Sequence, residues 1–363
     1  MLTFFINIIM DVLHIVPGFD NPFNGIAVAA KLIAKEQAAD IVEASEIGKI
    51  KDLSQYGEVW VHSCWLPMTL KACWRVLKAK RPLVRMMHAN LDPVRLKYHG
   101  WKKWLVGPLE RWILRRCERI VATCDEEMEW IERYLGKKCP QIEVTDVKRF
   151  FDFSRVERVE GGEILNRVER VETCRVGGDG NLSRVEGERV KSSEFRVQSW
   201  GTENSKLQTS NSKLNLLYLG RRHPLKGVEF LERAVYEIST RSTRSTRLNL
   251  ELRIVSNAFG EELEKVWEWC DVLVLPTLSE NFGLVVAEAL ERGKRVITTD
   301  GAPVWGEGLG VRGQELGVCV GYNGRLLYLK GYRDGVVEKR IELLKNAILV
   351  LSRDKMILSS KGV

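Results

Sequence analysis

The 363-residue chain lacks several features that would place it in a membrane, in an oxidising compartment or among metalloenzymes. Its eight cysteines are scattered, and no two of them have the two-residue spacing that is typical of zinc sites. No stretch is long and apolar enough to span a bilayer. No acidic pair of the Asp-x-Asp kind lies at the end of an expected strand. We therefore expect free thiols in a reducing cytoplasm, no transmembrane helix and no bound metal.

The beginning of the chain is apolar but lacks the signals of a secretory leader. The segment MLTFFINIIMDVLHIV carries Asp11, has no basic leader, and runs into PGFDNPFNG without a small-residue cleavage site. We expect its second half to be the first buried strand. Residues 1–9 are either a short membrane-contacting extension or precede a true start at Met10.

Positive charge is concentrated in one part of the chain. The net charge is +8, and residues 71–119 hold 14 Lys or Arg against three acidic residues. This mixture of cations and tryptophans suits anionic lipid headgroups or phosphate-bearing molecules, and a solvated helical face is the equal alternative. The sequence has no nucleic-acid-reading motif, so we expect no nucleic-acid partner. The tryptophans are Trp74, Trp101, Trp104 and Trp112.

The first 146 residues alternate short apolar runs with amphipathic stretches. Such alternation predicts a doubly wound α/β domain, in which ligands bind at the carboxyl ends of parallel strands. His88 falls at one such strand end. The runs include DVLHIV, GIAVAAKLIAK, VWVHSCW, MTLKACWRVLKAK, LVRMMH and RIVATC.

Residues 147–213 differ in character from both flanks. A degenerate repeat of Arg-Val-Glu is followed by WGTENSKLQTSNSK, and no hydrophobic face is wide enough to build a core. We predict a low-complexity, disordered insertion or linker here. From residue 214 to 363 strands and helices alternate again, which predicts a second Rossmann-like domain, ending in one amphipathic helix within GVVEKRIELLKNAILVLS.

The segment SENFGLVVAEALERG carries the clearest site chemistry. Glu280 follows an expected buried strand, and Gly283 lies at the start of a helix, so the amides from Phe282 to Leu284, after Asn281, are expected to lack intrahelical partners. Unpaired amides and the helix dipole bind phosphate. Glu280 is suited to accept hydrogen bonds from sugar hydroxyls, and Glu288, inside an apolar helix, to meet a ribose diol. Without a ligand, both glutamates are equally explained by solvation or internal pairing.

The longer segment LPTLSENFGLVVAEALERGKRVITTDGAP closely resembles the signature of retaining family 4 (group 1) glycosyltransferases, which have the GT-B fold of two Rossmann-like domains facing across a cleft. In that family two glutamates with seven residues between them follow a strand. The resemblance implies that Glu280 faces the donor sugar and Glu288 the ribose.

Three further segments match the same family. LLYLGRRHPLKGVEFL resembles its donor-phosphate loop, which implies that Arg221 and Lys226 hold the diphosphate and stabilise the leaving charge without a metal. VHSCWLPMTLKACWRVLKAKRPLVRMMHANLDP resembles the stretch that places His88 in the cleft. Gly25 matches the loop that approaches donor and acceptor, where glycine allows close contact.

The resemblance implies a metal-independent transferase that moves a sugar from a UDP- or GDP-linked donor to a saccharide or lipid-linked acceptor, with residues 1–146 on the acceptor side and residues 214–363 binding the donor. No separate cofactor is expected. The implied role is cell-envelope polysaccharide or lipopolysaccharide synthesis, in the cytoplasm at the inner face of the membrane. The chain departs from the family between Leu250 and Asp271. This stretch is short, and a helix and a strand that help to bind the nucleotide base in family members are expected to be missing from it. A catalytically degenerate nucleotide- or sugar-binding relative is the alternative.

Overall fold

The computed structural model describes residues 11–21, 24–98, 100–136, 138–153, 213–241, 248–307, 317–322 and 325–360. Within these ranges the chain forms two six-stranded sheets with helices on their faces. The predicted strand at residues 11–16 corresponds to β1 (Val12–Val16). Residues 1–9 and most of the repeat-rich segment lie outside the described residues.

The first sheet is entirely parallel, with the strand order β2-β1-β3-β4-β5-β6. Its central strands are short apolar runs that are buried on both faces, as parallel strands between helical layers require. Its strands are β1, β2 (Asp40–Glu43), β3 (Glu58–His62), β4 (Leu83–Met86), β5 (Arg119–Ala122) and β6 (Gln141–Val144).

The second sheet has the order β11-β12-β10-β9-β7-β8 and is parallel except for β11, which runs antiparallel to β12. After β8 the chain passes through one helix directly to β9, so β8 is an edge strand, in agreement with the shortened stretch in the sequence. The strands are β7 (Leu214–Leu219), β8 (Leu250–Val255), β9 (Val272–Val274), β10 (Arg295–Thr299), β11 (Gly317–Gly321) and β12 (Leu326–Lys330).

Local signals in the sequence set several helix ends. The Asn24 side chain accepts from the Ile26 amide at 3.2 Å and caps α1 (Gly25–Glu36). Three acidic residues occupy the first turn of α5 (Asp125–Leu135), where the helix dipole favours them. The remaining helices are α2 (Pro67–Lys78), α3 (Pro93–Lys97), α4 (Gly100–Leu114), α8 (Val228–Arg241), α9 (Gly260–Trp269), α10 (Leu284–Glu291) and α11 (Val337–Ser360), with short 3-10 turns η1 (Ala44–Lys49), η2 (Val147–Phe150), η3 (Pro224–Lys226) and η4 (Pro303–Trp305).

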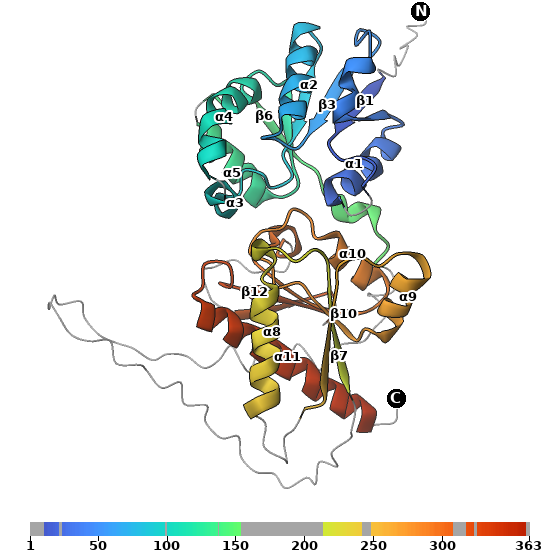
Figure 1. Cartoon of the computed structure of the whole chain (residues 1–363), viewed down its shortest axis with the longest axis vertical. Coiled ribbons are helices and arrows are strands. Elements are labelled where there is room, and N and C mark those ends of the chain that lie inside the picture. The colour runs from blue at the N-terminus through green and yellow to red at the C-terminus, as the bar shows by residue number, and fades with distance from the viewer. Residues whose placement is uncertain are drawn as a thin grey trace, which may run out of the picture.

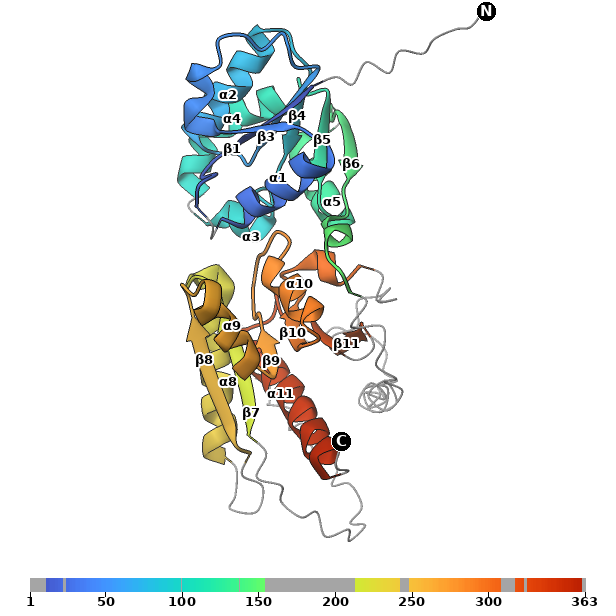
Figure 2. The same cartoon turned by 90° about the vertical axis from the view of Figure 1, so that its right-hand side faces the viewer.

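The predicted C-terminal helix is α11, which packs against α8. In the described part of the chain, no helix combines the length and the apolar character needed to cross a bilayer. The two sheets stack along the long axis of the molecule, with α3 on the side of the first domain that faces α10 of the second (Figures 1 and 2). The carboxyl ends of both sheets therefore face each other, as the GT-B fold requires.

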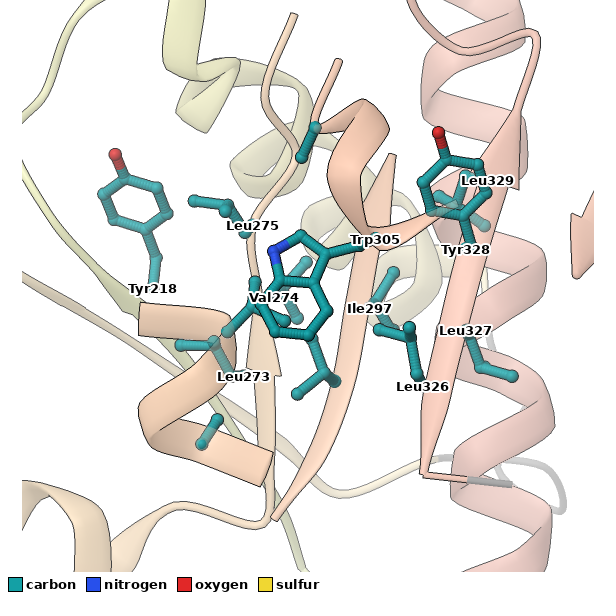
Figure 3. Close-up of a cluster of buried hydrophobic side chains, with 14 of the residues drawn as sticks. Tyr218, Leu273, Val274, Leu275, Ile297, Trp305, Leu326, Leu327, Tyr328 and Leu329 are labelled. Carbon is teal, nitrogen blue, oxygen red and sulfur yellow. The ribbon is translucent and has the colours of Figure 1, made fainter. Parts of the chain in front are cut away.

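The core of the second domain forms around Trp305, which is completely buried. Figure 3 shows its indole among side chains from β9, β10 and β12, with Leu275 and Ile297 close by. The indole Nε1 donates to the Phe282 carbonyl at 2.6 Å, so the core also fixes the loop that precedes α10.

The start of the segment that we predicted to be a disordered linker is instead packed. Val147 is completely buried, and Phe151 and Phe153 contact the second domain, where Phe151 stacks on Phe282 with ring centroids 5.7 Å apart. The prediction was wrong for residues 147–153 because their apolar side chains find a hydrophobic surface only in the tertiary fold. The rest of the segment, 154–212, lies outside the described residues.

Candidate functional site

A cavity of about 730 Å³ lies between the carboxyl ends of the two sheets and is lined by both domains. This volume is in the usual range for sites that bind small molecules. All ten residues that the sequence nominated line this one cavity. They are Gly25, His88, Arg221, Lys226, Glu280, Asn281, Phe282, Gly283, Leu284 and Glu288.

The N-terminus of α10 opens onto the cavity, and the helix begins at Gly283 and Leu284, where the sequence predicted its start. Gly283 is its N-cap residue and has a left-handed backbone (φ 69°, ψ 57°), a conformation in which glycine carries no steric penalty. A Cβ there would lie 3.3 Å from Leu275 and 3.4 Å from Glu280. Amides in the first turn of a helix have no intrahelical acceptor, so they present donors and partial positive charge to the cavity.

Lys226 and Glu280 form an ion pair at the wall of the cavity, with 19% and 17% of their side chains exposed. Burial opposes ionisation of Glu280, but the charges of Lys226 and Arg95 outweigh it and lower the pKa of Glu280. Burial also lowers the pKa of Lys226, and Glu280 offsets part of this effect. The sequence assigned these two side chains separate contacts with a ligand, and the structure adds that they neutralise each other.

Positive charge nevertheless dominates the lining. Besides Lys226, the cavity is lined by Arg95, Lys103, Arg221 and Arg222, against the carboxylates of Glu280 and Glu288. The sequence reasoning missed Arg95 and Lys103 as site residues, although both lie in the basic stretch that it had singled out. The only sequence feature that pointed to Arg95 and Lys103 was the local excess of positive charge. That excess does not show which of the cations line the cleft.

Arg95 connects the two domains at the cavity floor. Its Nε donates to Ser279 Oγ at 2.8 Å, and its Nη1 donates to the His88 carbonyl at 3.4 Å. Ser279 in turn donates to the buried Asp92, which also pairs with Arg333. The side chains of α3 and its N-cap therefore hold the loop before Glu280 in place.

Glu288 lies one helical turn further into α10 and lines the same cavity. Burial raises the pKa of this carboxyl, and the charge of Arg292 offsets part of the rise. A partly buried carboxylate that faces a cavity is suited to accept hydrogen bonds from a diol.

His88 lies two residues beyond β4 and is completely buried. Its backbone is left-handed (φ 54°), as is that of Ala89 (φ 56°), and the Ala89 amide donates to the buried Glu127. Such a conformation is strained for residues with a side chain and recurs at functional sites. The His88 ring nitrogens contact His62 at 2.9 Å and Asn281 at 2.9 Å, so the imidazole joins the domains.

Two of the glycines at the site differ in how strictly the fold requires them. Gly227, after the loop that carries Lys226, has φ 62°, and a Cβ there would lie 2.2 Å from the Pro276 carbonyl oxygen. At Gly25 a Cβ would lie 3.7 Å from Leu284 Cδ1, which is an ordinary contact. The protein's own packing therefore does not require a glycine at position 25, and the expected close approach there would be that of a ligand.

No group of three or more potential metal ligands, from His, Cys, Asp and Glu, is brought together in the part of the chain that the structure describes. The donors that converge on the cavity are guanidinium and ammonium groups and helix amides, which bind anions directly. Two doubly wound domains with such a cleft define the class of GT-B transferases.

Comparison with known families identifies the chain more closely. The Glycosyl transferase 4-like domain matches residues 24–145, and the Glycosyl transferases group 1 domain matches residues 213–320. Together they span well over half of the sequence. The chain therefore belongs to the family 4 (group 1) glycosyltransferases, and it is an enzyme that transfers a sugar from a nucleoside diphosphate sugar with retention of configuration.

Solved structures with the same fold share little sequence with the chain. The UDP-forming α,α-trehalose-phosphate synthase from Burkholderia xenovorans is 9% identical, with a TM-score of 0.51 over 96% of this chain and 93% of that one. The corresponding enzyme from Burkholderia vietnamiensis is 9% identical, with a TM-score of 0.50 over 96% and 92%. No curated protein matches the sequence.

Proposed function

We propose that the cavity binds a UDP- or GDP-linked sugar, with residues 214–363 holding the donor, residues 1–146 presenting the acceptor and residues 147–213 joining the two domains. The excess of cations over carboxylates in the cavity wall is the observation that carries this proposal. A diphosphate is dianionic, so several fixed cations and a helix N-terminus bind it and stabilise the charge that grows as it leaves.

Individual roles follow from chemistry and position. Arg221 and Lys226 contact the diphosphate, together with the amides around Phe282, Gly283 and Leu284. Glu280 accepts from hydroxyls of the donor sugar, and Glu288 accepts from the ribose diol. Since Lys226 already pairs with Glu280, a bound donor shares this pair rather than meeting two independent charges. His88 and Asn281 contact the sugar from the two sides of the cleft, and Gly25 leaves room for acceptor and donor.

The proposed transfer needs no enzymic nucleophile and no metal. The bond from the anomeric carbon to the phosphate oxygen breaks, and the acceptor oxygen forms its bond on the same face. The proton of the acceptor hydroxyl passes to the departing phosphate oxygen, so charge and atoms balance. Arg221, Lys226 and the first turn of α10 stabilise the nucleoside diphosphate as it departs.

We propose further that the acceptor is a saccharide or lipid-linked saccharide of the cell envelope, reached at the cytoplasmic face of the membrane. Support comes from α4 and its neighbour α2, whose exposed side chains combine tryptophans with cations such as Lys71 and Lys102. Apolar side chains rimmed by cations suit an anionic lipid surface. The exposed fractions are 56% for Trp74, 65% for Trp101, 78% for Trp104 and 61% for Leu105.

Co-sedimentation with vesicles tests the membrane contact. Vesicles that contain anionic lipid are expected to bind the wild-type chain, and a Trp101→Ser/Trp104→Ser variant is expected to bind at least about tenfold more weakly, because two large apolar side chains are lost. Tyr236→Ser is the matched control, since Tyr236 is 68% exposed on α8 of the other domain. Equal binding of all three proteins would refute the membrane contact.

Mass spectrometry of donor turnover tests the transferase assignment to this cavity. A panel of UDP- and GDP-sugars is incubated with wild type, Glu280→Ala, Arg221→Ala and the control Arg233→Ala, which alters an exposed arginine on α8 that does not line the cavity. Turnover that is lost in the first two variants and kept in the control supports the proposed site. Folded wild type without turnover of any sugar in the panel, even with lipid acceptors, would contradict the proposed UDP- or GDP-linked donor.

A further inference from the structure

Three histidines form a continuous buried row across the first sheet. His14 lies on β1, His62 ends β3 and His88 follows β4, and all three side chains are completely buried. His14 Nδ1 lies 2.8 Å from His62 Nε2, and His62 Nδ1 lies 2.9 Å from His88 Nε2. The row runs obliquely from the middle of the sheet to the edge that faces the cavity.

An amide closes each end of this row. His14 Nε2 lies 2.7 Å from Gln37 Oε1, at the end of α1. His88 Nδ1 lies 2.9 Å from Asn281 Nδ2, in the second domain, and the Thr123 hydroxyl, which donates to Glu127 Oε2 at 2.7 Å, lies 3.3 Å from Asn281 Oδ1. The row therefore links a helix end in the first domain with the loop that carries Glu280.

The Gln37 amide oxygen sets the position of every proton in the row. Gln37 Oε1 is an acceptor, so His14 carries its proton on Nε2, and its Nδ1 lone pair accepts from His62 Nε2. The same reasoning places the His88 proton on Nε2 and leaves Nδ1 as an acceptor. At the other end of the row, Asn281 Nδ2 donates to this lone pair. A single tautomer thus satisfies every contact.

Burial keeps the row neutral and the amide at its end prevents it from conducting protons. Burial lowers the pKa of His14 to about 4 and that of His88 to about 3, and it lowers the pKa of His62 well below its usual value. A proton taken up by His88 could move along the row only if Gln37 accepted one at the far end. A carboxamide is too weak a base for that, so the row fixes orientation and does not relay protons.

We propose that His14 and His62 are positioning residues, which fix His88 Nδ1 as a hydrogen-bond acceptor toward the cavity. His88 then accepts a hydrogen bond only from a group that carries a proton, either the Asn281 amide or a hydroxyl of the bound sugar. The inference rests on the proposed function only for the sugar. The fixed tautomer of His88 is a property of the first domain and is testable without substrate.

Nitrogen NMR of the full chain labelled with ¹⁵N-histidine measures the tautomers directly. We expect three histidines with a protonated Nε2 and an unprotonated Nδ1 that do not titrate between about pH 5 and 8, since burial opposes their protonation. Single variants assign the signals. A protonated Nδ1 on any of the three in the wild-type chain would overturn the proposal, whether or not the protein turns over a donor.

Variants of His62 connect the tautomer with activity. His62→Phe keeps a ring of similar size but removes both contacts, so His88 is expected to populate both tautomers and kcat/KM to fall about tenfold, which corresponds to about 1.4 kcal/mol. His62→Gln retains one donor and one acceptor, so it is expected to restore the single tautomer and activity to within about threefold. A folded His62→Phe variant with one unchanged His88 tautomer would overturn the proposal, as would loss of activity in both variants with His88 unaltered.

Discussion

The two domains each contain an ion pair near the carboxyl ends of their strands, and the two pairs differ in exposure. Arg85 on β4 pairs with Glu110 on α4 at 3.3 Å, and both side chains are completely buried. Lys226 and Glu280 are each nearly a fifth exposed, at the wall of the cavity. A pair sealed in the core serves the fold, whereas a pair open to a cavity is available to a ligand.

The surroundings of the pairs support this contrast. Arg85 also donates to the Ser63 carbonyl at 2.7 Å, so it ties down the backbone beyond β3. The charge of Glu280, by contrast, is stabilised from both domains, because Arg95 of the first domain adds to the effect of Lys226. The comparison predicts that breaking the first pair lowers stability and that breaking the second lowers activity.

Glu280→Gln is expected to have the largest effect. The substitution keeps the size of the side chain but removes the charge beside Lys226, so we expect turnover to fall by about 100-fold or more, as for the loss of one pre-organised polar group in other active sites. Initial rates by mass spectrometry measure this, with thermal unfolding as the control for the fold. A rate within threefold of wild type would show that the open pair is not catalytic.

Glu110→Gln is expected to affect the fold instead. Removing one partner of a completely buried pair leaves the Arg85 charge uncompensated, which costs about 3–5 kcal/mol. Urea denaturation followed by circular dichroism measures the free energy of unfolding. If Glu110→Gln and Glu280→Gln cost the same stability, the distinction between a structural and a functional pair fails.

Two glycine substitutions compare a loop position where the fold requires glycine with one where it does not. Gly227→Ala places a methyl group against the Pro276 carbonyl at a left-handed backbone position, so we expect a loss of about 1–3 kcal/mol and weaker donor binding through Lys226. Gly25→Ala has room for its methyl group and should change stability by less than about 0.5 kcal/mol. Denaturation and donor titration on both variants check this, and equal losses would contradict the steric argument.

The smallest expected effect is on the pH dependence of stability. Burial raises the pKa of Glu126 to about 7, against the opposing charge of Arg333. The folded chain therefore binds this proton more tightly than the unfolded chain, and stability falls as pH rises from about 4.5 to 7. Since the side chain is 42% exposed, water screens the effect. Denaturation at a series of pH values measures the free energy of unfolding. Glu126→Gln should make its dependence on pH flatter between about pH 4.5 and 7, and an unchanged slope would contradict the raised pKa of Glu126.

The sequence was informative where function depends on neighbours along the chain. Glu280 before a helix, Gly283 at its N-cap and Glu288 one turn later were readable because helix geometry converts their spacing into positions. The order of strands and helices was readable for the same reason, since apolar periodicity reports burial. The antiparallel strand β11 carried no comparable local signal.

The sequence by itself determined the family, the two α/β domains and the residues at the start of α10, because these depend on local patterns. Only the tertiary structure brought His14, His62 and His88 into one row, paired Lys226 with Glu280, turned Arg95 toward the cavity and packed Phe151 on the second domain. Those contacts join residues that are distant in the chain, and the physical reason is that the sheet order and the closure of the two domains, not sequence spacing, set the distances between their side chains.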